Sequence, residues 1–235
     1  MLFRSHRPSI LPRVEDWGAH LEREAGRYAD GESRLPTAED PDQRQRQLTR
    51  LGNAAYGAAL CALMLREEDA AREWLARAAA RYRESFDDAP PGSWGRPIGA
   101  MKAHMLAGDW PAAGDAARWA LDAGAEKSES PIGRYAACLA LLVLGREEEA
   151  RAQADELRTH EGFPRPVADA LAMIAAGTDA VGYVLAVEEV LDSFEARDEY
   201  LEDVPVADTV IVLQALAERR GLARAELSSP LLPSG

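Results

Sequence analysis

The sequence predicts an all-α fold in which antiparallel helical hairpins stack as a tetratricopeptide-like solenoid or bundle of about ten helices. Three observations predict it. Apolar residues recur at spacings of three and four along most of the chain, which places them on one side of an α-helix. Val-rich runs of alternating apolar and polar residues, which would indicate strands, are nearly absent. The middle of the chain also carries a weak internal repeat.

That repeat consists of a leucine, a short polar turn and an alanine six residues after the leucine. The three alanines are Ala71, Ala112 and Ala150, separated by 41 and 38 residues. This period is close to that of two-helix solenoid repeats but longer and less regular than the about 34 residues of a tetratricopeptide array. A small residue at this point lets two helices approach closely, and Gly108 and Gly145 supply the tight turns. We therefore expect tetratricopeptide-like hairpins.

In chain order, the predicted helices cover residues 13–29, 42–65, 68–86, 97–107, 110–123, 131–144, 147–160, 166–176, 180–202 and 208–220. Breaks rich in Gly and Pro separate several of them, at residues 31–41, 87–97, 126–131 and 162–166. The runs 51–65 and 132–144 are apolar almost all round, which is typical of the inner helix of a buried pair. Residues 147–158 are apolar on one side only and predict an outer helix.

The longest break, DDAPPGSWGRP at residues 87–97, carries Trp94 in a Pro- and Gly-rich loop. Loops of this length are often functional, but a Trp in such a loop more often anchors it onto the core. We expect residues 1–235 to form one all-helical domain, and this loop is the place where it would subdivide.

The predicted helix that ends at residue 202 has an apolar side and an acidic side. The apolar side carries Val184, Val187, Leu191, Phe194 and Leu201. Beside it runs a stripe of carboxylates at helical spacing, formed by Glu188, Asp192, Glu195, Glu199 and Glu202. Such a stripe is either a hydrated helix face or a surface that binds a basic protein, and these five carboxylates are the predicted partner-binding residues.

The last predicted helix has signals at both ends. Pro205 breaks the chain before it, Asp208 is expected to be its N-cap, and Gly221 supplies the left-handed residue that ends it. Val210, Leu213, Leu216 and Ala217 form the apolar stripe that packs this helix inward.

The C-terminal segment, VLQALAERRGLARAELSSPLLP from Val212 to Pro233, combines a Leu- and Ala-rich helix, an Arg-Gly stop and a Ser-Pro-x-Leu-Pro tail. It resembles the C-terminal end of the bacterial immunity protein 49 family, and the matching residues are Arg220, Gly221, Ser229, Pro230, Leu232 and Pro233. The preceding acidic helix departs from the family's pattern, since the aromatic residue expected after its charged turn is represented only by Tyr200. The resemblance implies a non-enzymatic α-helical protein that binds and neutralises a toxin made by the same cell or its kin.

Composition limits the partners of the chain. The net charge is −13, which argues against nucleic acid or anionic lipid as a partner, although a high-salt cytosol would also explain the acidity. No stretch approaches the roughly 20 continuous apolar residues of a membrane span, and residues 1–12 lack the apolar core of a signal peptide. Cys61 and Cys138 lie in apolar helical runs and predict buried thiols in a reducing compartment. We therefore expect a cytoplasmic protein.

No catalytic or metal-binding motif is present in the sequence. The four histidines are too scattered for a metal site, and His104, on a mostly apolar helix, is more readily explained as a core residue than as a general base. The sequence therefore predicts no cofactor and favours a binding protein over an enzyme. Three interpretations remain: a protein that neutralises a basic toxin, a solenoid scaffold that binds peptides in a groove lined by Asn53 and Tyr56 or Tyr135, or an enzyme whose residues meet only in the folded chain.

Overall fold

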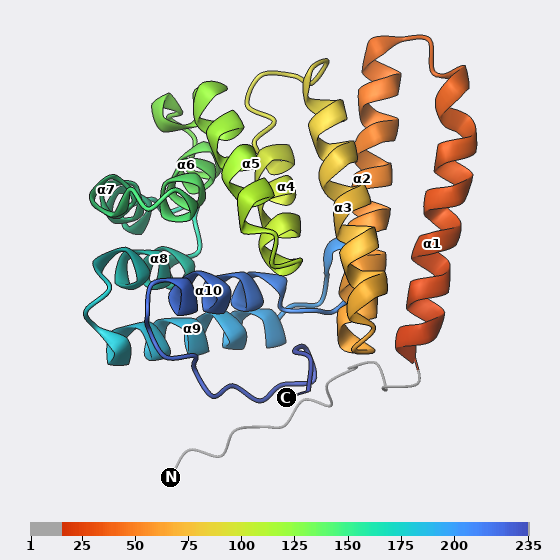
Figure 1. The fold of residues 1–235 in the computed structure, drawn as a ribbon. Coiled ribbons are helices and arrows are strands. Elements are labelled where there is room, and N and C mark those ends of the chain that lie inside the picture. The colour runs from red at the N-terminus through yellow and green to blue at the C-terminus, as the bar shows by residue number, and fades with distance from the viewer. Residues whose placement is uncertain (1–15, 235) are drawn as a thin grey trace.

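Every regular element in the described part of the chain is helical. The computed structural model describes residues 16–234 and is drawn in Figure 1. The predicted helix start at residue 13 and the stretch 1–12 lie outside the described residues. The helices are α1 (Asp16–Arg34), α2 (Pro41–Met64), α3 (Glu68–Phe86), α4 (Gly95–Leu106), α5 (Trp110–Asp122), α6 (Pro131–Val143), α7 (Glu147–Arg158), α8 (Arg165–Ala176), α9 (Ala180–Glu195) and α10 (Asp208–Arg219). Short 3-10 turns are η1 (Leu35–Thr37), η2 (Ala125–Lys127) and η3 (Leu201–Asp203).

The helices pack in chain order, which confirms the predicted stack of hairpins. Each helix from α1 to α8 contacts the next one, and the row runs from α1 on the right of Figure 1 to α7 on the left. Helix α10 departs from this order, because it packs against α8, α9 and also α4. The C-terminal part of the chain thus returns to its first half.

Three hairpin turns share one conformation. Each contains a residue with positive φ and, five residues later, a buried alanine; the turn residues are Arg66, Gly108 and Gly145, and the alanines are Ala71, Ala113 and Ala150. The predicted repeat position Ala112 is wrong by one residue, since Ala113 is the buried alanine of the middle hairpin and Ala112 is partly exposed. The turn and the alanine together define the repeat.

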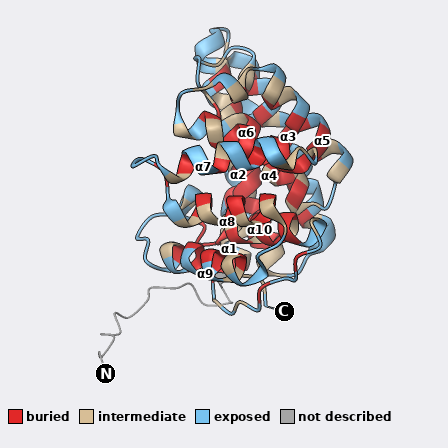
Figure 2. Cartoon of the chain, turned by 90° about the vertical axis from the view of Figure 1, so that its left-hand side faces the viewer, coloured by how far each residue is buried: buried red, intermediate tan, exposed pale blue. Residues whose placement is uncertain are grey.

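The predicted inner and outer helices are confirmed. Helix α6 buries nearly every residue from Tyr135 to Val143, and α2 is similarly buried over its second half. Helix α7 buries only Ala150, Ala154 and Leu157, and Figure 2 shows exposed segments on its outer side. The buried apolar side chains form one cluster that extends from Trp17 to Leu231.

Helix α1 is longer than predicted, because Gly31 does not break it. A Cβ on Gly31 would lie 2.9 Å from both Gln47 Nε2 and Leu51 Cδ2 of α2. Gln47 also donates a hydrogen bond to the Gly31 carbonyl oxygen. The glycine therefore allows α1 and α2 to approach, and the helix continues to Arg34.

The loop before α4 is shorter than predicted, since α4 begins at Gly95. Trp94 is only 9% exposed, which confirms that it anchors the loop onto the core. Both cysteines are free and buried, as predicted. Within residues 16–234, no helix has the length and apolar character needed to cross a membrane.

Candidate functional site

The predicted acidic stripe does not form as one surface, because α9 ends at Glu195 and not at residue 202. Two contacts at this end replace further helical turns. The Tyr200 hydroxyl donates a hydrogen bond of 2.7 Å to the Phe194 carbonyl oxygen, and the Arg197 guanidinium lies 3.7 Å from the centre of the Phe194 ring. Carboxylates one turn apart would also repel each other in a longer helix.

Four of the five predicted partner-binding residues are consequently exposed, and the fifth is not. Glu188, Asp192 and Glu195 are exposed on α9, and Glu195 accepts a hydrogen bond of 2.8 Å from Ser229. Glu199 is exposed in the connection after the helix. Glu202 turns inward, where its side chain is 13% exposed and pairs with Arg27. Glu202 therefore lies apart from the exposed carboxylates of α9, and its part in partner binding stays a prediction.

Two exposed apolar residues accompany the carboxylates that remain on α9. Val181 is 71% exposed and Leu185 is 58% exposed. The spacings from Val181 to Leu185, Glu188 and Asp192 in turn are four, three and four residues. All four side chains therefore lie on one face of α9. This face is apolar at the beginning of the helix and acidic toward its end.

A second candidate site is a cavity of about 370 Å³ between the first hairpins and the C-terminal helix. Three aromatic side chains form part of its wall: Tyr56 from α2, Tyr82 from α3 and Trp94 from the loop before α4. Polar residues from α2, α4 and α10 complete it, among them Asn53, Arg96, Lys102 and Asp208. Apolar walls with a few polar groups are typical of binding pockets.

Two glycines hold Tyr82 in the cavity wall. A Cβ on Gly52 would lie 2.8 Å from the Tyr82 ring, and one on Gly99 would lie 2.6 Å from it. The ring therefore fits between α2 and α4 only because both positions lack a side chain. Its hydroxyl donates a hydrogen bond of 3.0 Å to Asn53 Oδ1, and burial raises the pKa of this hydroxyl above its ordinary value.

Asp208 lies at the cavity and is not the predicted N-cap of α10. The N-cap is Ala207, and the Asp208 carboxylate turns toward α2 and α4. It pairs with the Lys102 ammonium and accepts a hydrogen bond of 2.9 Å from the Tyr56 hydroxyl. Burial acts to raise the pKa of Asp208, but Lys102 and Tyr56 outweigh it and hold that pKa below its ordinary value of 3.8.

Arg96 is the cavity cation that lacks an anionic partner among the described residues. Its guanidinium donates to the amide oxygen of Gln45 and, at 3.0 Å, to the hydroxyl of Ser85. Both acceptors are neutral. Burial lowers the pKa of Arg96, as expected for a charge that no nearby carboxylate compensates.

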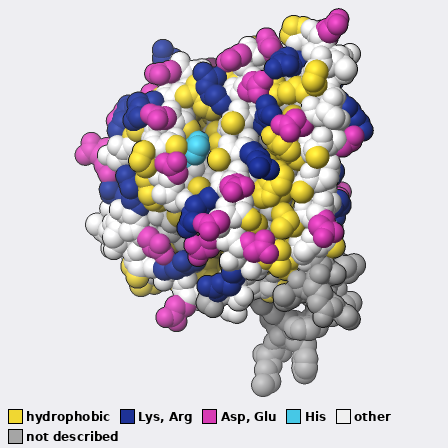
Figure 3. All heavy atoms as spheres, turned by 45° about the vertical axis from the view of Figure 1, so that its right-hand side comes forward, with side chains coloured by type: hydrophobic (Ala, Val, Ile, Leu, Met, Phe, Trp, Pro, Cys, Tyr) yellow, Lys and Arg dark blue, Asp and Glu magenta, His cyan; other side chains and the backbone are white. Residues whose placement is uncertain are grey.

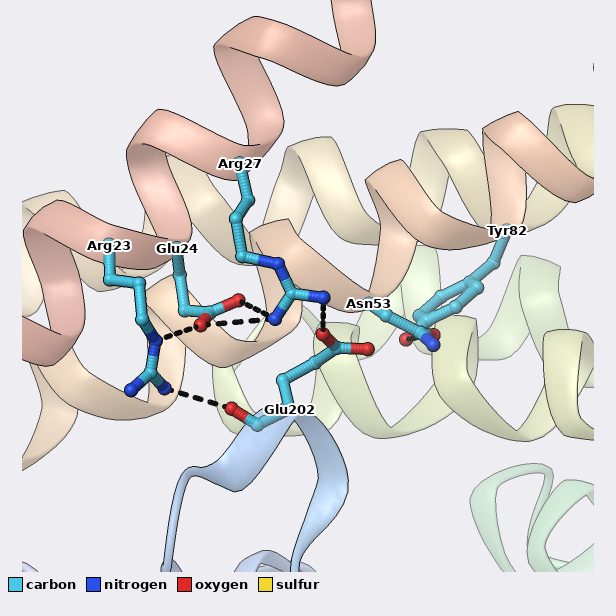
Figure 4. A network of polar contacts seen from close by, with 6 residues as sticks. All are labelled: Arg23, Glu24, Arg27, Asn53, Tyr82 and Glu202. Carbon is cyan, nitrogen blue, oxygen red and sulfur yellow. Dashed lines mark hydrogen bonds and ion pairs between the residues drawn. The ribbon is translucent and has the colours of Figure 1, made fainter.

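A network of ion pairs lies beside the cavity and joins α1 to the connection between α9 and α10. Glu24 is fully buried and pairs with Arg23 at 2.8 Å and with Arg27 at 3.1 Å. Arg27 also pairs with the Glu202 carboxylate, and Arg23 donates a hydrogen bond of 2.9 Å to the Glu202 carbonyl oxygen. Figure 4 shows Glu202 extending from the connection toward Arg27, on the side where Asn53 and Tyr82 lie.

The backbone of this connection is strained where it meets α1. Glu202 and Asp203 both have φ of 55°, in the left-handed region. This conformation is unfavourable by about 1 to 2 kcal/mol for each residue other than glycine. Such conformations persist where surrounding contacts hold them, and the contacts of Glu202 with Arg23 and Arg27 do so here.

Sequence reasoning identified part of this cavity. Asn53 and Tyr56 line it as the scaffold interpretation predicts, whereas Tyr135 packs against Phe163 with ring centres 5.4 Å apart and is not among the lining residues. Tyr82, Arg96 and Lys102 were missed. One signal was available for Lys102, because it is one of only two lysines in the chain and lies in the apolar run IGAMKAHML.

Other places in the molecule offer less for a specific ligand. A larger cleft of about 660 Å³ lies between the end of α2 and the C-terminal tail, with Arg66, Glu68, Arg224 and Glu226 in its walls. These charges are of both signs. His104 is half-buried on α4 outside the described lining of the cavity, and burial lowers its pKa. Among residues 16–234 no three His, Cys, Asp or Glu side chains are grouped so that they would hold a metal ion.

Comparison of the chain with protein-family models, with curated proteins and with solved structures finds no match. The resemblance of the C-terminal segment to the immunity protein 49 family therefore stays a prediction. Two features of the structure bear on function, the cavity and the exposed face of α9.

Proposed function

We propose that this chain is a non-enzymatic protein-binding module that holds a segment of a partner protein in the cavity between α2, α3 and α4. The observation that carries the proposal is the convergence of aromatic and hydrogen-bonding side chains on one cavity of about 370 Å³. Tyr82 and Trp94 offer apolar surface to a side chain of the partner, and Asn53 and Arg96 offer polar groups to its backbone. Binding is favoured over catalysis because the acid–base groups Asp208, Lys102 and Tyr56 of the lining are engaged with one another.

A second candidate function is neutralisation of a basic toxin through the exposed face of α9. Val181 and Leu185 favour it, since exposed apolar residues beside charged ones are typical of interaction surfaces. Glu188 and Asp192 on the same face would attract a basic partner and speed its association. On the face drawn in Figure 3, acidic and basic side chains are instead interspersed, so that face would not attract a basic partner in the same way.

One capture experiment tests both candidates. The tagged full-length protein is used to isolate bound proteins from its own cells at low and high salt, and the amount of each is compared between variants. Asn53→Ala with Arg96→Ala alters the cavity. Glu188→Lys with Asp192→Lys reverses the α9 face, and Glu156→Lys with Glu161→Lys makes the same charge change at other exposed positions.

A partner lost only with the cavity variant would support the proposed function. A basic partner lost with the α9 variant, retained by the control pair and released by salt would support toxin neutralisation instead. Equal capture by all variants, with unchanged circular dichroism, would contradict both proposals.

A further inference from the structure

The connection between α9 and α10 contacts the first hairpin through a small number of polar groups. The Glu202 carboxylate pairs with Arg27, and its carbonyl oxygen accepts a hydrogen bond of 2.9 Å from Arg23. A Cβ on Gly57 of α2 would lie 3.5 Å from the Glu202 Cβ, so the connection lies within van der Waals distance of α2 at this point. Leu201, the preceding residue, forms part of the cavity wall while remaining 50% exposed.

These contacts hold residues 201–203, the strained and largely exposed tip of the connection. Leu201 and Asp203 are exposed, and Glu202 and Asp203 are both in the left-handed conformation. The tip therefore gains little from apolar burial and depends on its charged contacts. Strain of this kind is typical of segments that change position when a ligand binds.

The cations around the cavity indicate the chemistry of that ligand. Arg27 and Lys102 are paired with carboxylates that the C-terminal part of the chain supplies, Glu202 and Asp208. Arg96, by contrast, contacts only neutral oxygen atoms among the described residues. A ligand with carboxylates would compensate Arg96 and compete with Glu202 for Arg27.

We infer that Tyr200–Asp203 is a tethered ligand, and that the partner segment recognised at the cavity is an extended acidic peptide that displaces it. This inference rests on the proposed function and narrows it to one ligand chemistry. A carboxylate of the peptide takes the place of Glu202 on Arg27, a second one reaches Arg96, and an apolar side chain between them replaces Leu201. Asp208 stays in place, because it belongs to α10 and is held by Lys102 and Tyr56.

The test uses a labelled synthetic peptide with the sequence of residues 196–207, ARDEYLEDVPVA, added to the full-length protein. Fluorescence anisotropy gives its Kd for the wild type and for Glu202→Ala. We expect binding at least about tenfold tighter to Glu202→Ala, because the tethered copy no longer competes. Glu199→Ala is the matched control, since Glu199 is an exposed carboxylate of the same connection, and it is expected to behave as the wild type.

Two further measurements show whether the peptide binds through its charge. Adding Arg96→Ala to Glu202→Ala is expected to weaken binding about tenfold or more. A peptide in which Gln and Asn replace Glu and Asp is expected not to bind. Circular dichroism and thermal unfolding of each variant show whether it is folded, and Glu202→Gln, which keeps the side-chain shape, replaces Glu202→Ala if the latter is unfolded.

The inference is overturned if the acidic peptide does not bind the folded Glu202 variant, binds it no better than the wild type, or binds no better than the peptide in which Gln and Asn replace Glu and Asp. These outcomes are distinct from failure of the proposed function. A cavity variant that still captures the partner rejects that function even when the peptide binds. A partner whose capture depends on the cavity supports it even when the peptide does not.

Discussion

Asp208 joins three helices through one carboxylate. It starts α10, pairs with Lys102 of α4 and accepts a hydrogen bond from Tyr56 of α2. The side chain of Asp208 is 15% exposed and that of Lys102 is 11% exposed. Each charge is therefore largely removed from water and is stabilised by the other. Removing one charge leaves the other nearly buried and unpaired.

We therefore expect Asp208→Asn to lower the free energy of unfolding by about 3 kcal/mol at neutral pH. Urea denaturation followed by circular dichroism measures this change. Glu188→Gln removes an exposed carboxylate from α9 and is the control, with an expected change within about 0.5 kcal/mol. A loss below 1 kcal/mol for Asp208→Asn would mean that the pair contributes little to stability.

The pH dependence of the same variant is a second prediction. The pKa of Asp208 in the folded chain lies below its ordinary value of 3.8, so near that pH the unfolded chain binds more protons than the folded one. The stabilisation is then complete above the ordinary pKa and is lost as pH falls through the folded pKa. We expect the stability difference between wild type and Asp208→Asn to shrink as pH falls from about 5 toward 3, and a constant difference would contradict this.

The packing of Tyr82 between two glycines gives a third prediction. Gly99→Ala places a methyl group 2.6 Å from the Tyr82 ring, which already lies against α2 at Gly52 on its other side. Overpacking of this kind costs about 1 to 3 kcal/mol, which exceeds the gain of about 1 kcal/mol in helix propensity. Gly26→Ala is the matched control, because a Cβ there has no atom within 4 Å. Calorimetry is expected to show a lower Tm for Gly99→Ala and a higher one for Gly26→Ala.

At the scale of the elements, the helices were predictable and the ends that shape the site were not. Apolar spacing located the ten helices of residues 16–234 because each one buries a continuous stripe. The end of α9 depends on Tyr200 and Arg197, which contact Phe194, and on Glu202, whose partner Arg27 lies in the first helix. The contact of Glu202 with Arg27 joins residues far apart in the sequence and leaves no local pattern.

The same limit explains the cavity. Asn53 and Tyr56 were found because Asn and Tyr side chains were expected to converge on the groove of a peptide-binding solenoid. Tyr82 and Lys102 were not, because their positions depend on how α3, α4 and α10 align along one another. Glycines that permit close approach, such as Gly52 and Gly99, look like any other helical glycine in the sequence.

The hairpin turns provide a prediction at this scale. Arg66 has φ of 62°, where the equivalent turns have Gly108 and Gly145. Arg66→Gly is expected to raise the free energy of unfolding by about 1 kcal/mol by relieving this strain, less a small loss from its exposed hydrogen bond to Ser234. Gly145→Ala is expected to lower it by a similar amount. Chemical denaturation measures both, and changes of the same sign would contradict the assignment of these turns as equivalent.

For the whole molecule, the two cysteines are reporters of unfolding. Cys61 and Cys138 have no exposed surface, and burial raises the pKa of the Cys61 thiol to about 12. We expect both to be unreactive toward a disulfide reagent at about pH 8 in the native protein and to react at the rate of free thiols in urea. Fast labelling of either thiol in native buffer would show that its part of the core opens independently.

The return of α10 to the first hairpins affects how the protein is made. Tyr56 and Asp208, which share a hydrogen bond, are 152 residues apart in the sequence. At a synthesis rate of about 5 to 20 residues per second, roughly 8 to 30 s pass between their additions to the chain. During that interval Arg23 and Arg27 can already pair with Glu24 of their own helix, whereas Lys102 still lacks Asp208. A ribosome-bound chain therefore carries a lysine without the carboxylate that pairs with it in the finished protein.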